Sequence, residues 1–274
     1  MSNPGPYTRA QLTEQGIDAR RLAVLLEQGR LRRVRQGWYA DAFTPEAAVR
    51  AVQLGGRLGC LSACEVHGLW VPPHSGLHVV LNPGAKPPAL PPNGVQFHRL
   101  GTPCATAVAP LEESVRHVLH RHDEETGLVV LESAVDKKLL HEADARHLLT
   151  GVSSRNRVLD QRFSASAQSG SETRLRLFFA RLRVPVRPQA FIAGIGHIDL
   201  LVGRSWIIEA DSQAHHSAPR DVDVDCARDL TARRLGYARD RLSYKQIWLT
   251  WASTQEWLLV MLRTRKHLRP PAPL

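Results

Sequence analysis

The sequence predicts an α/β protein made of an N-terminal winged helix-turn-helix, an α+β middle region and a C-terminal α/β domain with a mixed sheet. Helix-capping signals precede apolar residues at helical spacing, and short apolar or basic runs flank glycine-containing turns. A polar stretch rich in Ser and Arg separates the last two regions. The 274 residues are enough for two or three compact units. We therefore expect domains at 1–43, 44–152 and 171–274, with a linker at 153–170.

The formal net charge of +10 favours an anionic partner such as DNA. Arginine outnumbers lysine, which suits phosphate contacts but is equally typical of a GC-rich genome. The chain begins with MSNPGP, which lacks the features of a secretory signal, and no apolar run approaches the roughly 20 residues that span a bilayer. We therefore expect a cytoplasmic protein that does not enter the membrane.

The first 43 residues predict two helices followed by a basic hairpin. Thr8 and Gln11 form a capping box for the first helix, and Asp18 can cap the second. Two short strands then flank the turn at Gln36-Gly37. The cations expected to face DNA are Arg20, Arg21, Arg32, Arg33 and Arg35. They would mostly contact phosphates, which positions a protein on DNA without selecting a sequence.

The middle region predicts helices and strands without obvious chemistry. Ser62 to Glu65 resembles a capping box, and strands are expected at 78–81 and 95–100. The cysteines show no paired C-x-x-C spacing, so we expect small buried apolar side chains and no structural zinc. Glu113, His117 and His120 share one face of a predicted helix, which we interpret as a solvated face.

The C-terminal region predicts a helix capped by Ser169, an extended segment at 186–192, a hairpin at 196–211 and a helix at 221–235. Strands are expected at 237–242 and 246–250.

Three carboxylates lie at the ends of the two apolar strands of this hairpin: Asp199, Glu209 and Asp211. Alternation places Glu209 and Asp211 on one face. Asp199 joins them only if the loop is odd, with Val202 opposite Trp206; a two-residue turn would put Asp199 opposite Ile208. The register of the hairpin is therefore a test of the site.

Converging carboxylates repel one another unless a cation neutralises them. Oxygen ligands suit Mg²⁺ or Mn²⁺, which can bind a scissile phosphate and activate a water molecule. The alternative is that these acids pair with the many arginines of the chain.

The segments SET (171–173), HIDLLV (197–202), WIIEADSQAHH (206–216) and RDLTARRLGY (228–237) resemble the branch of the PD-(D/E)xK endonuclease superfamily that is related to very-short-patch-repair endonucleases. The resemblance covers about residues 165–262. It implies that Asp199 and Glu209 are metal ligands and that Glu172 assists, although Glu172 also fits a helix cap. Asp211 stands where the superfamily has its lysine, and His215 or His216 could serve as general base instead.

The segments YTRAQL (7–12) and GRLRRVRQGWYA (29–40) resemble the winged helix of AbiEi-type antitoxins, and LSACE (61–65) is similar to the remainder of that family. This resemblance implies DNA binding. Two functions follow: a metal-dependent DNA endonuclease, or an antitoxin-like regulator whose nuclease domain is degenerate. A homodimer and a toxin or defence-system partner are both compatible with the sequence.

Overall fold

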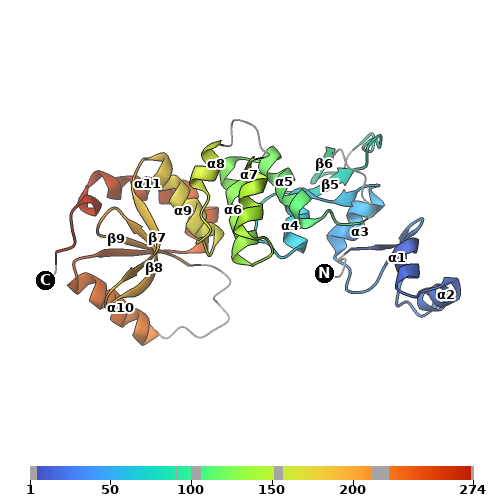
Figure 1. Ribbon diagram of the computed structural model, residues 1–274, viewed down its shortest axis with the longest axis horizontal. Helices are drawn as coiled ribbons and strands as arrows, with labels where there is room; N and C mark the ends of the chain where they lie inside the picture. The colour runs from blue at the N-terminus through green and yellow to red at the C-terminus, as the bar shows by residue number, and fades with distance from the viewer. Residues whose placement is uncertain (1–4, 91, 100–105, 151–156, 212–221, 273–274) are drawn as a thin grey trace. The chain divides into compact units, whose positions relative to one another are not determined.

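The computed structural model describes residues 5–90, 92–99, 106–150, 157–211 and 222–272. The chain divides into two compact units, Met1–Asp123 (unit 1) and Glu124–Leu274 (unit 2), each of which contains both helices and strands (Figure 1). The sequence predicted three domains, whereas the structure groups the helices that follow Asp123 with the C-terminal sheet. No helix among the described residues combines the length and the apolar character needed to cross a bilayer.

The predicted linker at 153–170 contains a helix. Helix α8 spans Arg157–Arg162, and Leu159, Phe163 and Ala167 are buried. The part of this stretch that the structure describes therefore contains a helix and buried apolar residues.

Unit 1 begins with the predicted pair of helices and a hairpin. The elements are β1 (Tyr7–Thr8), α1 (Arg9–Glu14), α2 (Ala19–Glu27), β2 (Arg32–Arg35) and β3 (Trp38–Ala40), with sheet order β1-β3-β2. The capping box of Thr8 and Gln11 is present, and Asp18 accepts a hydrogen bond from the backbone N–H of Arg21. A small apolar core holds these elements together: Leu12, Leu22, Leu25, Leu31 and Tyr39.

The rest of unit 1 is a three-stranded sheet packed against helices. Its elements are α3 (Glu46–Gln53), β4 (Arg57–Leu58), α4 (Cys60–Val66), β5 (Leu77–Leu81), β6 (Val95–Arg99) and α5 (Leu111–Arg121). Strand β5 pairs antiparallel with β4 and parallel with β6. The expected capping role of Ser62 is wrong, because α4 begins at Cys60 and Ser62 lies inside it. The Ser62 hydroxyl instead accepts a hydrogen bond from the backbone N–H of His78.

Unit 2 begins with helices α6 (Glu124–Asp136), α7 (Glu142–Thr150) and α8, followed by α9 (Gly170–Arg181). Helices α6 and α9 are joined through the buried Glu132, which pairs with Arg176 and accepts hydrogen bonds from the Thr173 hydroxyl and the Ser164 backbone. This buried ion pair explains how a charged residue is accommodated in the apolar middle of α6.

The sheet of unit 2 consists of β7 (Val186–Ile192), β8 (Gly196–Val202), β9 (Trp206–Ala210) and β10 (Ala238–Leu242), in the order β10-β9-β8-β7. Strand β8 pairs antiparallel with both β7 and β9, and β10 runs parallel to β9. Apolar residues of α9 and α11 (Trp251–Arg263) pack on one face of the sheet, and those of α10 (Val222–Arg234) pack on the other. The predicted strand at 246–250 is wrong, because Lys245–Leu249 forms a π-helical turn, η3; a 3₁₀ turn, η4, spans Lys266–Leu268.

Candidate functional site

The turn between β8 and β9 sets the register of the candidate carboxylate site. Val202 pairs with Trp206 across the loop Gly203-Arg204-Ser205, and Leu200 pairs with Ile208. Gly203 has a φ of +62°, and a Cβ atom there would overlap the carbonyl oxygen of His267. Only glycine adopts this conformation without strain. The odd loop on which the carboxylate site depends is present, and the alternative with a two-residue turn is excluded.

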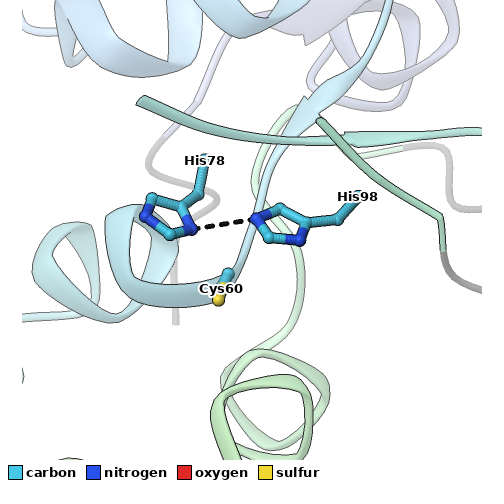
Figure 2. A group of neighbouring side chains, drawn as sticks. All are labelled: Cys60, His78 and His98. Carbon is cyan, nitrogen blue, oxygen red and sulfur yellow. Dashed lines mark hydrogen bonds between the residues drawn. The ribbon is translucent and has the colours of Figure 1, made fainter. Parts of the chain in front are cut away.

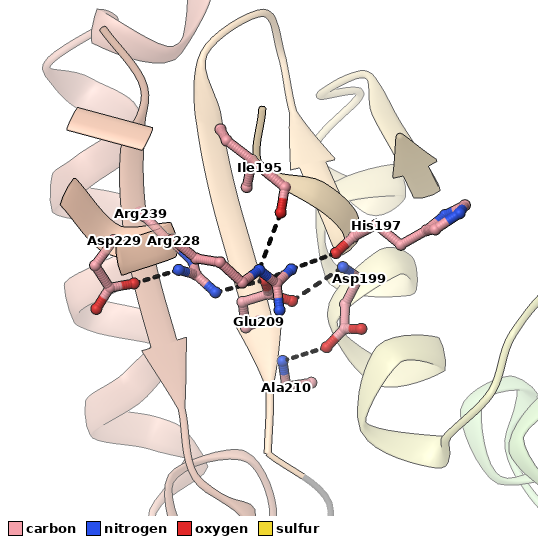
Figure 3. Close-up of polar contacts among 8 residues, drawn as sticks. All are labelled: Ile195, His197, Asp199, Glu209, Ala210, Arg228, Asp229 and Arg239. Atoms are coloured by element: carbon pink, nitrogen blue, oxygen red, sulfur yellow. Dashed lines mark hydrogen bonds and ion pairs between the residues drawn. The ribbon is translucent and has the colours of Figure 1, made fainter. Parts of the chain in front are cut away.

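Beyond Leu200 the two strands are joined through the side chains of the acids themselves. The backbone N–H of Asp199 donates to Glu209 Oε2 (3.1 Å), and the backbone N–H of Ala210 donates to Asp199 Oδ2 (2.8 Å). Figure 3 shows the two carboxylates side by side, with Arg228 and Arg239 next to Glu209. Asp199 and Glu209 are therefore brought together, as the register required.

The alternation assumed for β8 is interrupted at this point. Ile198 and Leu201 belong to the same apolar cluster, on the side of α10, although they are three residues apart in a strand. Glu209 contacts cations of α10 and β10, whereas Asp199 lies close enough to Glu172 of α9 for that carboxylate to raise its pKa. Asp199 and Glu209 therefore meet where the alternation of side chains along β8 is irregular.

Two arginines neutralise Glu209. Arg239 of β10 lies 3.0 Å from Glu209 Oε1, and Arg228 of α10 lies 3.8 Å from the same oxygen. Arg239 also pairs with Asp229, and Arg228 donates to the backbone carbonyls of Ile195 (3.0 Å) and His197 (2.6 Å). The arginine pairing that the sequence left open is thus present for Glu209.

Asp199 has no arginine partner among the contacts of the described residues. Burial raises its pKa to about 7, and the nearby charges of Glu172 and Glu209 add to the effect. Burial also raises the pKa of Glu172, which accepts hydrogen bonds from the side chain of Gln189 (2.8 Å) and the backbone of Gln168 (3.3 Å). Ser169 caps α9 at the backbone N–H of Glu172, as predicted, so this acid has both a structural role and a place in the cluster.

The structure gives fewer contacts for the other predicted site residues, Asp211, His215 and His216. The backbone N–H of Asp211 donates to the carbonyl of Leu242 (2.8 Å) and so continues the pairing of β9 with β10. In the described part of the chain, Asp199, Glu209 and Asp211 do not bring three ligand atoms within 4.8 Å of one another. His215 and His216 lie outside the described residues.

The donor set of this cluster suits a divalent cation. Carboxylate oxygens are the ligands that Mg²⁺ and Mn²⁺ prefer, and a cation would relieve the repulsion that raises the pKa of Asp199. Asp199, Glu209 and Glu172 likewise do not bring three ligand atoms within 4.8 Å of one another among the described residues, and the Glu209 carboxylate pairs with Arg239.

The predicted DNA-binding arginines are all exposed: Arg20, Arg21, Arg32, Arg33 and Arg35. Arg20 and Arg21 belong to α2, and the other three belong to β2. Glu46 pairs with Arg32 at 2.8 Å, and the guanidinium of Arg33 lies 5.9 Å from the centre of the Tyr39 ring. The N-terminal helices and hairpin thus present a surface with several positive charges.

Sequence reasoning missed a second group of ligating side chains, in unit 1. Cys60, His78 and His98 each place one ligand atom within 4.8 Å of the others, so this group could hold a metal ion (Figure 2). His117, interpreted from the sequence as part of a solvated face, is instead buried beside His98. These residues come from different elements and share no sequence spacing, so only the fold could reveal them.

Burial and the neighbouring histidines lower the pKa of His78 and His117 to about 3, and that of His98 to about 4. Burial raises the pKa of the Cys60 thiol to about 11. Cys64 is buried as expected, whereas Cys226 is exposed.

No protein-family model and no curated protein matches this chain.

Proposed function

We propose that this chain is a DNA-binding, metal-dependent endonuclease of the PD-(D/E)xK type. The observation that carries the proposal is a half-buried carboxylate, Asp199, beside the buried Glu172 and Glu209 at the end of an apolar hairpin. Burying acids together costs free energy, and a site that binds a cation is a physical reason to retain them. The positive surface of α2 and β2 supports a DNA substrate.

Asp199 and Glu209 would hold the Mg²⁺ or Mn²⁺ ion, and Glu172 would lie beside them. The bound ion would supply Lewis-acid stabilisation of the phosphate and lower the pKa of a bound water molecule. The chain itself fixes the acids: the backbone of Asp199 and Arg239 hold the two oxygens of Glu209, and the backbone of Ala210 holds one oxygen of Asp199. Each carboxylate oxygen has two lone pairs, so these hydrogen bonds leave lone pairs on both acids for the cation.

The test is cleavage of plasmid and single-stranded DNA by the full-length protein in Mg²⁺ or Mn²⁺. Asp199→Asn and Glu209→Gln are expected to abolish cleavage while leaving DNA binding intact. Glu256→Gln, at an exposed position of α11, is the matched control and should cleave normally. Cleavage that survives both substitutions would overturn the proposed site.

A second function is favoured by the two arginines beside Glu209. Arg239 and Arg228 already neutralise Glu209 without a metal ion, which is the arrangement expected of a degenerate nuclease domain in a DNA-binding regulator. This alternative predicts tight DNA binding with no cleavage under any metal condition. It also predicts that Mg²⁺ does not stabilise the protein.

The DNA-binding surface can be tested separately through its salt dependence. Neutralising Arg20 and Arg21 together by glutamine should weaken binding and reduce the slope of log K against log salt by about 2, because each phosphate contact contributes roughly 0.9. Arg146→Gln, an exposed cation of unit 2, is the control. An unchanged slope in the double variant would exclude α2 from the DNA interface.

A further inference from the structure

Four elements of unit 1 bring one cysteine and several histidines together around the start of α4. Cys60 is the first residue of α4, His78 lies on β5, His98 lies on β6 and His122 follows the last residue of α5. The distances are short: 2.9 Å from His78 Nδ1 to His98 Nε2, and 3.0 Å from Cys60 Sγ to His122 Nε2. All of these residues belong to unit 1, so the cluster does not depend on how the two units are arranged.

We propose that Cys60, His78, His98 and His122 form a structural Zn²⁺ site in unit 1. Thiolate and imidazole are the ligands that zinc takes in structural sites, which are closed and four-coordinate. With Zn–S near 2.3 Å and Zn–N near 2.0–2.1 Å, tetrahedral ligand atoms lie about 3.3–3.6 Å apart. The three central ligand atoms already lie within 4.8 Å of one another, so small side-chain rotations are enough.

The backbone around these ligands is held in place. The Gly59 N–H donates to the carbonyl of His78 (3.0 Å), while the N–H of His78 donates to the Ser62 hydroxyl (3.1 Å). A side chain at Gly59 would overlap Val80, so α4 can start here only because this position is glycine. The start of α4 and the His78 backbone are therefore locked together, and they position Cys60 beside the imidazoles (Figure 2).

The backbone at Cys60 is strained. Cys60 has a φ of 52°, a left-handed conformation that costs a non-glycine residue about 1–2 kcal/mol. His78 is 1% exposed, so its imidazole is buried near this strained residue. Backbone strain of this kind is typical of a functional site.

His117 lies beside the proposed site and is not one of its four ligands. It is 3% exposed, its ring packs edge-on against His98 at 4.7 Å between centroids, and neither ring nitrogen has a hydrogen-bond partner among the described residues. We assign the fourth ligand to His122 because its Nε2 lies 3.0 Å from the Cys60 sulfur and its ring centroid lies 5.5 Å from that of His78.

The inference is independent of the proposed nuclease activity. Its test is metal binding by the full-length protein after dialysis against a chelator, using Zn²⁺ for stoichiometry and Co²⁺ as a spectroscopic probe. We expect one tight Zn²⁺ per chain and, with Co²⁺, a thiolate charge-transfer band. Zn²⁺ should also raise the unfolding temperature, because binding energy at a site formed only in the folded chain stabilises the fold.

The variants are chosen in matched pairs. Cys60→Ser and His78→Gln should each weaken Zn²⁺ binding by about 100-fold or more, since even residues outside the ligand set typically contribute 10–100-fold. Cys64→Ser, at a buried position one turn further along α4, and His120→Gln, at an exposed position of α5, should bind normally. Asp199→Asn should also bind normally, which separates this site from the carboxylates of unit 2.

A variant that misfolds could lose the metal for a trivial reason, so His98→Cys provides a gain of signal. This substitution keeps a zinc ligand and adds a second thiolate, so the Co²⁺ charge-transfer band should increase. The proposal is overturned if the native chain binds no stoichiometric metal. It is also overturned if Cys60→Ser binds as the native chain does, or if Cys64→Ser loses binding as Cys60→Ser does.

Discussion

Asp199 allows the chemistry of the carboxylate site to be tested through stability alone. Its pKa of about 7, against an ordinary value of 3.8, means that the folded state disfavours the charged form. At about 1.4 kcal/mol per pKa unit, this difference corresponds to roughly 4 kcal/mol. Because the folded pKa is raised, the stabilising contribution is complete below about pH 4, falls as the pH rises and is lost above about pH 7.

Asp199→Asn removes this penalty and keeps the acceptor for the Ala210 N–H. In chelator at about pH 8, the free energy of unfolding of unit 2 should increase by up to roughly 4 kcal/mol, and the difference should shrink toward about pH 4. Added Mg²⁺ should stabilise the native chain and leave the variant unchanged. Denaturant unfolding across this pH range is the assay, with Glu256→Gln as control. A variant no more stable than the native chain at about pH 8 would refute the reasoning.

Three other predictions concern the same fold. Gly203→Ala should lower the free energy of unfolding by more than about 2 kcal/mol, because the left-handed backbone is strained and the added Cβ overlaps His267. Gly196→Ala is the control and should lower it by less, because a Cβ at that position meets no atom within 4 Å. Arg239→Met should lower the free energy of unfolding by about 3 kcal/mol or more, because it leaves Arg228 as the remaining ion-pair partner of Glu209 among the described contacts. A loss below about 1 kcal/mol in denaturant unfolding would contradict a buried ion pair between Arg239 and Glu209. In metal-free protein, unit 1 should lose stability as the pH falls from about 6.5 toward 3–4. The buried histidines have lowered pKa values, so the unfolded chain binds more protons than the folded chain in this range. An unfolding temperature that does not change with pH in calorimetry would exclude this effect of the buried histidines.

The sequence determined the local structure that depends on neighbouring residues. The capping residues Thr8, Asp18 and Ser169 act where they were expected, because a cap involves atoms only two or three positions away. The sequence made the carboxylate site conditional on an odd hairpin loop, and the structure has a three-residue loop with Val202 opposite Trp206. The local sequence pattern gave a wrong prediction at Ser62. This residue has the pattern of a helix cap but lies inside α4, where its hydroxyl accepts a hydrogen bond from His78 of β5.

Only the tertiary structure decided what surrounds each candidate ligand. The pairing of Glu209 with Arg239 and the approach of Asp199 to Glu172 join residues from separate strands and helices, and no spacing along the chain encodes those distances. The same reason explains why the cluster around Cys60 and His78 was missed. The proposed metal site draws on four elements and has no sequence period, because its side chains meet only after the sheet and the helices of unit 1 have packed together.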